Sequence, residues 1–121
     1  MELRLQKTTV ENILDDLERT WHRIEGDMSI RNQEALGVLK DIMAHYFEEK
    51  AVAAWDNGNL IGVAVYEVFE DVDLGTRDTH ISEMASFTPI LGVGMRLVQE
   101  IVDIARENGS DTITARHAPG Y

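Results

Sequence analysis

The stretch that decides the fold of this chain is Thr79-His80-Ile81-Ser82-Glu83-Met84-Ala85-Ser86-Phe87. It is followed by Gly92-Val93-Gly94 and by a helical pattern over Met95 to Arg106. The first run has the composition of a strand, and the glycines open directly onto the helix. The first N–H groups of a helix have no partner inside it and lie at the positive end of its dipole. Such an end attracts an anion by about 0.3–1 kcal/mol per charge at an exposed site. We therefore expect a phosphate-bearing cofactor to bind at this turn.

Upstream of this stretch, the chain changes from an edge strand to helical spacing. Residues 1–7 alternate apolar and polar. Thr8 and Glu11 then have the spacing of a capping box, so we expect Thr8 to cap a helix that ends at Gly26. Asn32 is the expected cap of a second helix. Its apolar residues repeat at helical spacing and are Leu36, Leu39, Ile42, Met43, Tyr46 and Phe47.

Extended runs follow the second helix. Asn57-Gly58 separates the runs 51–55 and 60–69, and Asn-Gly is a strong hairpin signal. We expect the acidic residues 70–78 to connect this hairpin to the strand 79–87. Asn108-Gly109 predicts the end of the last helix, and residues 111–116 a final strand. The order β-α-α-β-β-β-α-β predicts one α+β domain over residues 1–121, with a mixed, mainly antiparallel sheet flanked by helices.

Charge and composition exclude several classes of function. The 22 acidic residues outnumber the 11 basic ones, which gives a formal charge of −11 and argues against nucleic-acid binding. No apolar run reaches the ~20 residues of a membrane helix. The chain has no cysteine, so a thiolate metal site and a cysteine nucleophile are excluded. We expect a cytoplasmic protein without a metal, in which His22 and His45 are ordinary surface or core residues.

The order of elements resembles that of the GNAT acetyltransferase superfamily. The specific part is Ile81 to Phe87, then Pro89, Gly92-Val93-Gly94 and Leu97. The resemblance implies acetyl-coenzyme A as donor and an amine as acceptor. It also implies that the free edge of the strand at Ser86, Phe87 and Thr88 pairs with the pantetheine arm. The pyrophosphate would be held by the loop and helix start formed by Leu91, Gly92, Val93, Gly94, Met95 and Arg96.

Two features depart from the family pattern. Pro89 occupies the position where the family loop has Gln or Arg, and Pro has no backbone donor. Arg96 is placed to supply the missing charge. The sequence also ends at Tyr121, so we expect the closing strands of the family to be missing. Tyr121 is then the candidate proton donor for the departing thiolate, with a frayed terminus as the alternative.

Glu83 is the candidate general base. Strand alternation predicts that it shares a face with Ile81, Ala85 and Phe87, while His80, Ser82, Met84 and Ser86 take the other face. Apolar neighbours would raise its pKa, as a base acting near neutral pH requires. The alternative is a solvated glutamate without a role.

These features predict an N-acetyltransferase in which an amine attacks the thioester directly. The alternative is a non-catalytic coenzyme A-binding or regulatory module with a degenerate site. The expected last strand would lie at an open edge of the sheet, and such an edge invites pairing with another chain. We therefore expect a homodimer.

Overall fold

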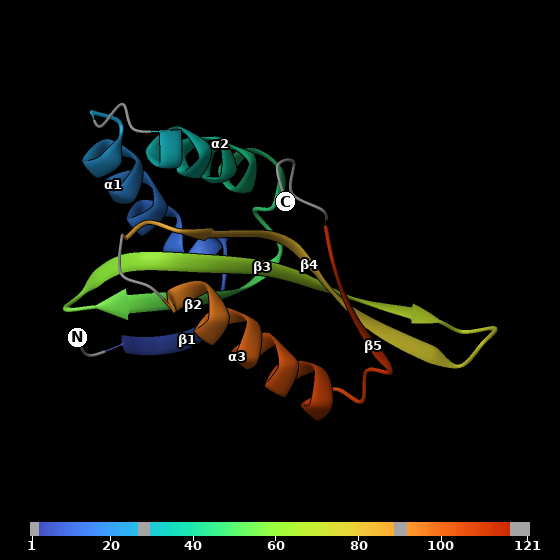
Figure 1. Ribbon diagram of the computed structural model, residues 1–121. Coiled ribbons are helices and arrows are strands. Elements are labelled where there is room, and N and C mark those ends of the chain that lie inside the picture. The colour runs from blue at the N-terminus through green and yellow to red at the C-terminus, as the bar shows by residue number, and fades with distance from the viewer. Residues whose placement is uncertain (1–2, 27–29, 89–91, 117–121) are drawn as a thin grey trace.

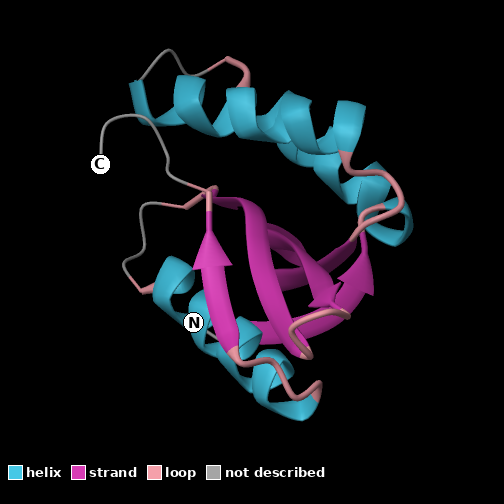
Figure 2. Cartoon of the chain, turned by 90° about the vertical axis from the view of Figure 1, so that its right-hand side faces the viewer, coloured by secondary structure: helices cyan, strands magenta, loops and turns pink. Residues whose placement is uncertain are grey.

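The computed structural model describes residues 3–26, 30–88 and 92–116 and confirms the predicted order of elements. Two helical layers enclose one sheet, with α1 and α2 on one side and α3 on the other (Figures 1 and 2). The elements are β1 (Leu3–Thr9), a short 3-10 turn (Glu11–Ile13), α1 (Leu14–Ile24), α2 (Ile30–His45), β2 (Lys50–Asp56), β3 (Asn59–Asp71), β4 (Thr76–Ser86), α3 (Val93–Glu107) and β5 (Thr112–Ala115).

The five strands lie in the order β1-β2-β3-β4-β5. The first three pairings are antiparallel, and β5 lies parallel to β4. Asn57 and Gly58 have φ angles of 50° and 79°, which is the conformation that a two-residue hairpin turn requires. The predicted mixed, mainly antiparallel sheet and the predicted Asn-Gly hairpin are therefore both confirmed.

Each face of the sheet has its own apolar core. The α1/α2 side buries Leu17, Leu39 and Ile42 against Val63 and Val65. On the α3 side, the buried side chains are Val93, Leu97, Ile101, Tyr66 and Ile81. Because successive strand residues face opposite ways, β3 contributes alternate residues to the two cores.

Several predicted boundaries were wrong. Thr8 lies in β1, and Thr9 accepts a hydrogen bond from the Asn12 N–H at 3.3 Å instead. The first helix therefore begins with a 3-10 turn rather than a capping box. Asn32 lies within α2, which begins at Ile30, because helical geometry extends past the residue whose side chain favoured a cap.

The acidic segment 70–78 is mostly strand rather than a connector. Glu70 pairs with Arg77 and Asp71 with Thr76, so the polar side chains line a long hairpin that projects from the sheet (Figure 1). Phe47 was expected on an apolar helical face, but α2 ends at His45 and Phe47 is 42% exposed.

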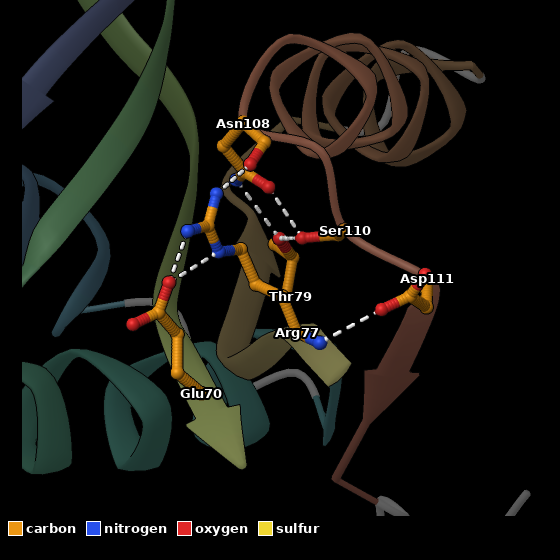
Figure 3. Close-up of polar contacts among 6 residues, drawn as sticks. All are labelled: Glu70, Arg77, Thr79, Asn108, Ser110 and Asp111. Carbon is orange, nitrogen blue, oxygen red and sulfur yellow. Dashed lines mark hydrogen bonds and ion pairs between the residues drawn. The ribbon is translucent and has the colours of Figure 1, made fainter. Parts of the chain in front are cut away.

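A polar clamp, here called the β4 clamp, joins the end of α3 to β4 and β5 (Figure 3). Gly109 has a φ of 76°, and the N–H groups of Gly109 and Ser110 bond the carbonyls of Arg106 and Ala105, as in a Schellman motif. This confirms the predicted Asn-Gly helix end. The six residues of the clamp are Glu70, Arg77, Thr79, Asn108, Ser110 and Asp111.

Thr79 is fully buried at the centre of the β4 clamp. Its hydroxyl lies 2.7 Å from the Ser110 hydroxyl and accepts from the Asn108 side-chain amide at 3.1 Å, while Ser110 donates to the Asn108 side-chain oxygen. Arg77 bonds Glu70 and the Asn108 carbonyl, and its backbone N–H donates to Asp111 at 2.9 Å. The clamp satisfies its buried polar groups and fixes where β5 begins.

Candidate functional site

The edge of β4 that faces β5 is paired over only part of its length. β5 pairs with Asp78 to Ile81, and the last bond along this edge runs from the Arg116 N–H to the Ile81 carbonyl at 3.1 Å. β4 itself continues to Ser86. Within the described part of the chain, no backbone group bonds this edge beyond Ile81. The two strands thus separate next to Ser82.

Strand geometry identifies the backbone groups on this open edge. The Phe87 N–H donates to the Ile61 carbonyl at 2.8 Å and therefore points toward β3. Because backbone groups alternate sides along a strand, the N–H and C=O of Ser86 and Met84 point away from β3. These groups are placed to pair with an added extended segment.

The N-terminus of α3 supplies a second set of free donors. Gly92 occupies the cap position with a φ of 94°, a conformation that other residues rarely adopt. Among the described residues no side chain caps this end, and the first turn of α3 contains no acidic residue. A Cβ added at Gly94 would meet nothing within 4 Å, so the space over this turn is open. The helix begins at Val93, before the predicted Met95, and Gly94 is therefore part of the first turn.

A close packing contact holds the helix end beside the open edge of β4. Gly62 on β3 is paired with Ser86, and a Cβ at Gly62 would lie 2.9 Å from Val93 Cγ1. Only glycine allows α3 to approach this closely. The side chain of Val93 is buried in the core, so this residue can offer a ligand only its backbone, whereas Met95 and Arg96 are exposed.

A β-bulge places Ile81 and Glu83 on opposite faces of the sheet. Tyr66 pairs with Ile81 but Val65 pairs with Glu83, so Ser82 is an extra residue in β4. Directly paired residues share a face, which places Ile81 on the α3 side and Glu83 on the α1/α2 side. The prediction that Ile81 and Glu83 share a face was wrong, because a bulge shifts the alternation by one residue. Glu83 does share its face with Ala85 and Phe87, as expected.

Glu83 lies in a mostly buried position with one charged partner. Its side chain is 12% exposed, and Arg116 Nη1 donates to Glu83 Oε1 at 3.0 Å. Burial raises the pKa of the Glu83 carboxyl, the Arg116 charge lowers it, and nearby Asp41 raises it further. The net shift is upward, which is the direction that the sequence predicted. Arg116 is 63% exposed, so water screens much of its attraction.

A hollow of about 300 Å³ opens next to this pair, on the α2 side of the sheet. Glu67 lies in the wall of the hollow. The pKa of the neighbouring Glu49 carboxyl is raised by burial, by a hydrogen bond to Glu67 and by repulsion from Glu67. The hollow is thus lined by aromatic side chains, one carboxylate and the Arg116 cation. Its lining residues are Tyr46, Glu67, Phe69, His80, Ser82 and Arg116.

A larger hollow of about 630 Å³ lies at the opposite end of α3 and was not anticipated. Of its cations, Lys7 is paired with Glu107 and Arg77 with Glu70. It lies away from the open end of β4. Among residues 3–26, 30–88 and 92–116, no group of three His, Asp or Glu residues is placed to bind a metal. None of the described helices is long and apolar enough to cross a membrane.

Comparison of the fold with solved structures finds extensive likeness. A ribosomal-protein-alanine N-acetyltransferase from Brucella melitensis biovar Abortus 2308 superposes with a TM-score of 0.67 at 13% identity, over 98% of this chain and 82% of its own. The aminoglycoside N-acetyltransferase AAC(6')-Iy in complex with coenzyme A gives 0.63 at 12%, over 98% and 78%. This chain has the GNAT fold. A transcriptional regulator from Bacillus halodurans C-125 also matches, with a TM-score of 0.65 at 15% identity over 98% and 83%.

At these identities the likeness establishes the GNAT fold and nothing finer. No protein-family model and no curated protein matches the sequence. Of the predicted site residues, Ser86 is the last residue of β4, and Phe87 and Thr88 follow it directly. Gly92 is the cap residue of α3, and its first turn contains Val93, Gly94, Met95 and Arg96. Leu91 and Tyr121, like Pro89, lie outside the described residues.

Sequence reasoning missed three contributors to the site. Gly62 gave no signal beyond being a glycine within a strand, which can mark a close approach of the backbone. Arg116 was treated only as the end of a strand. Ser82 could not be recognised as a bulge, because a bulge depends on the register with β3 rather than on the sequence of β4 alone.

Proposed function

We propose that this protein is an N-acetyltransferase that transfers an acetyl group from acetyl-coenzyme A to an amine. One observation carries the proposal: the open edge of β4 lies beside an uncapped helix N-terminus, with a buried carboxylate a few residues away. The GNAT fold supports the reaction class.

The cofactor site would be built mainly from the backbone. The N–H groups at the start of α3 would hold the pyrophosphate, with Arg96 near enough along the helix to add a positive charge. The open N–H and C=O groups of Ser86 and Met84 would pair with the amide groups of the pantetheine arm. An added Cβ at Gly94 would meet nothing within 4 Å, so this side of the first turn leaves room for a ligand. Bound there, acetyl-coenzyme A supplies a thioester carbonyl that an amine can attack.

Glu83 would accept the proton that the acceptor nitrogen loses as it attacks the thioester. An amine with a pKa near 10.4 is almost fully protonated at neutral pH, and freeing its lone pair costs about 4–5 kcal/mol. A positioned base contributes roughly 10²–10⁴ in rate. The raised pKa of Glu83 moves it toward the range in which a carboxylate acts well as a base. The aromatic side chains and the Glu67 carboxylate in the wall of the hollow would favour a cationic acceptor, because Glu83 pairs with the Arg116 charge.

Calorimetric titration with acetyl-coenzyme A, and with free coenzyme A for comparison, tests the cofactor site. We expect micromolar binding that is lost in Gly94→Glu, which places a negative charge at the anion site. The matched control is Gly94→Ala, which adds a side chain into open space and should bind as the parent does. Absence of binding to the parent would contradict the proposal.

Turnover should then be measured with a panel of amines that includes aminoglycosides and a peptide with an N-terminal alanine. We expect Glu83→Gln to lower kcat by about 10²-fold or more while coenzyme A affinity is kept. The second candidate is a coenzyme A-binding module without turnover. The ion pair that engages Glu83 with Arg116 favours it, and a parent that binds coenzyme A but acetylates nothing would establish it.

We also propose that the protein is a cytoplasmic homodimer. All four residues of β5 are exposed, and in the described part of the chain no strand covers its outer edge. An exposed edge of this kind invites pairing with a second copy. Light scattering at micromolar concentration should give the mass of a dimer, and a monomer would contradict this assembly.

A further inference from the structure

A chain of hydrogen bonds links β4 and β5 where the two strands are paired. His80 Nδ1 lies 2.8 Å from Thr114 Oγ1, and Thr114 Oγ1 lies 2.7 Å from Asp78 Oδ2. Thr112 donates to the other oxygen of Asp78 at 2.8 Å. The parallel register makes these contacts possible, because it pairs Asp78 with Thr112 and His80 with Thr114 on one face.

The direction of these bonds fixes the tautomer of His80. An ionised carboxylate only accepts hydrogen bonds, so the Thr114 hydroxyl donates to Asp78 and its single proton is used there. The contact between Thr114 and His80 then requires the Nδ1–H to donate to Thr114 Oγ1. A neutral imidazole carries one N–H, so Nε2 keeps a free lone pair. No residue in the described part of the chain bonds Nε2.

The bulge at Ser82 places this imidazole on the same side of the sheet as Glu83. His80 pairs with Glu67 and Glu83 with Val65, and these two partners lie on one face of β3. In a regular strand, positions 80 and 83 would face opposite ways. His80 lines the same hollow as Arg116, the partner of Glu83.

Transfer to a protonated amine needs two proton acceptors. An ammonium group carries three protons and the product amide nitrogen carries one, so two protons must leave as the N–C bond forms and the C–S bond breaks. One proton ends on the departing thiolate and the other in solvent. With Glu83 as the only base, the same carboxylate would have to release the first proton to solvent before it accepts the second.

We propose that His80 is a second catalytic base of this site, with Thr114 and Asp78 as its positioning residues. Nε2 takes the first proton from the ammonium group in the hollow and passes it to solvent. Glu83 takes the second as the nitrogen attacks, and this proton goes to the thiolate. Asp78 holds the Thr114 hydroxyl, and Thr114 in turn holds the orientation of the imidazole ring. This inference rests on the proposed acetyl transfer.

The tautomer provides a test that does not depend on activity. Two-bond ¹H–¹⁵N correlation spectra of imidazole-labelled protein, with His80→Gln for assignment, should show neutral His80 protonated at Nδ1. Thr114→Val removes the acceptor and should move the proton to Nε2, with the signals of His22, His45 and His117 unchanged. A parent already protonated at Nε2 would overturn the positioning role.

The kinetic test uses the best amine from the screen above. We expect His80→Gln to lower kcat at least tenfold with coenzyme A affinity unchanged, and Thr114→Val to have a smaller effect of the same kind. His22→Gln, on the exposed side of α1, is the matched control and should behave as the parent. Parental turnover in His80→Gln would overturn this role alone. A parent that binds coenzyme A but acetylates no amine would overturn the proposed function and this role together.

Discussion

The two halves of β4 differ in how their backbone is used. Over Asp78 to Ile81 the strand is paired on both sides, and the β4 clamp and the hydrogen bonds from Thr114 to His80 and Asp78 hold β5 against it. From Glu83 to Ser86, β3 is the only described strand that pairs with it. The first half is therefore fixed by the protein itself, and the second offers its free edge to a ligand. A strand can be both scaffold and binding surface when its neighbour ends early.

Proline substitutions at the adjacent residues Ala85 and Ser86 should show most strongly how the paired edge of β4 differs from its open edge. The Ala85 N–H points toward β3, so Ala85→Pro removes a ladder bond and leaves a carbonyl unpaired. We expect a loss of about 3 kcal/mol or more in the free energy of unfolding, measured by urea denaturation.

Ser86→Pro removes a donor from the open edge instead. We expect it to keep most of the stability but to weaken coenzyme A binding by roughly two- to twelvefold, the range of one hydrogen bond. Equal destabilisation by Ala85→Pro and Ser86→Pro would contradict the assignment of the open edge.

Gly62→Ala tests the contact that sets α3 beside the open half. The new Cβ would lie 2.9 Å from Val93 Cγ1, so the Val93 side chain or α3 must shift. We expect a loss of about 1–3 kcal/mol in stability and weaker coenzyme A binding. Gly37→Ala, in the exposed part of α2 with nothing within 4 Å, is the control and should stabilise by about 0.5–1 kcal/mol. If Gly62→Ala and Gly37→Ala changed the free energy of unfolding in the same direction, the contact between Gly62 and Val93 would not be close.

Thr79→Val tests the paired half by opening the ring of hydrogen bonds in the β4 clamp. It keeps the volume of the side chain but leaves the groups of Asn108 and Ser110 with fewer partners. We expect a loss of about 1–2 kcal/mol in the free energy of unfolding. Thr76→Val, at the exposed start of β4, should change it by no more than about 0.5 kcal/mol. A neutral Thr79→Val would mean that the clamp does not hold β5.

The smallest expected effect is on the pH dependence of stability. Because burial raises the pKa of Glu83, the native state binds more protons than the unfolded chain between the ordinary and the raised value. Stability from this group therefore falls as the pH rises through that range. Glu83→Gln should remove this fall, so its stability relative to the parent should be higher at about pH 8 than at about pH 4. Urea midpoints at the two pH values measure this, and a constant difference would contradict the raised pKa.

Much of the fold was accessible from local patterns. Helical spacing identified α1, α2 and α3, and the Asn57-Gly58 and Asn108-Gly109 pairs identified a hairpin and a helix end, because these residues satisfy backbone conformations that few others adopt. The boundaries were less accurate. Thr8 and Asn32 have the side chains of helix caps, but the structure uses Thr9 at the first helix and continues α2 past Asn32.

The sequence by itself determined the order of elements, the glycine turn before α3 and the candidate carboxylate Glu83, since each depends on residues close together in the chain. Only the tertiary structure decided which face Glu83 occupies, that Arg116 pairs with it, and that His80, Thr114 and Asp78 meet across two strands. A bulge and a parallel register are properties of two paired strands. No pattern within one strand can fix them.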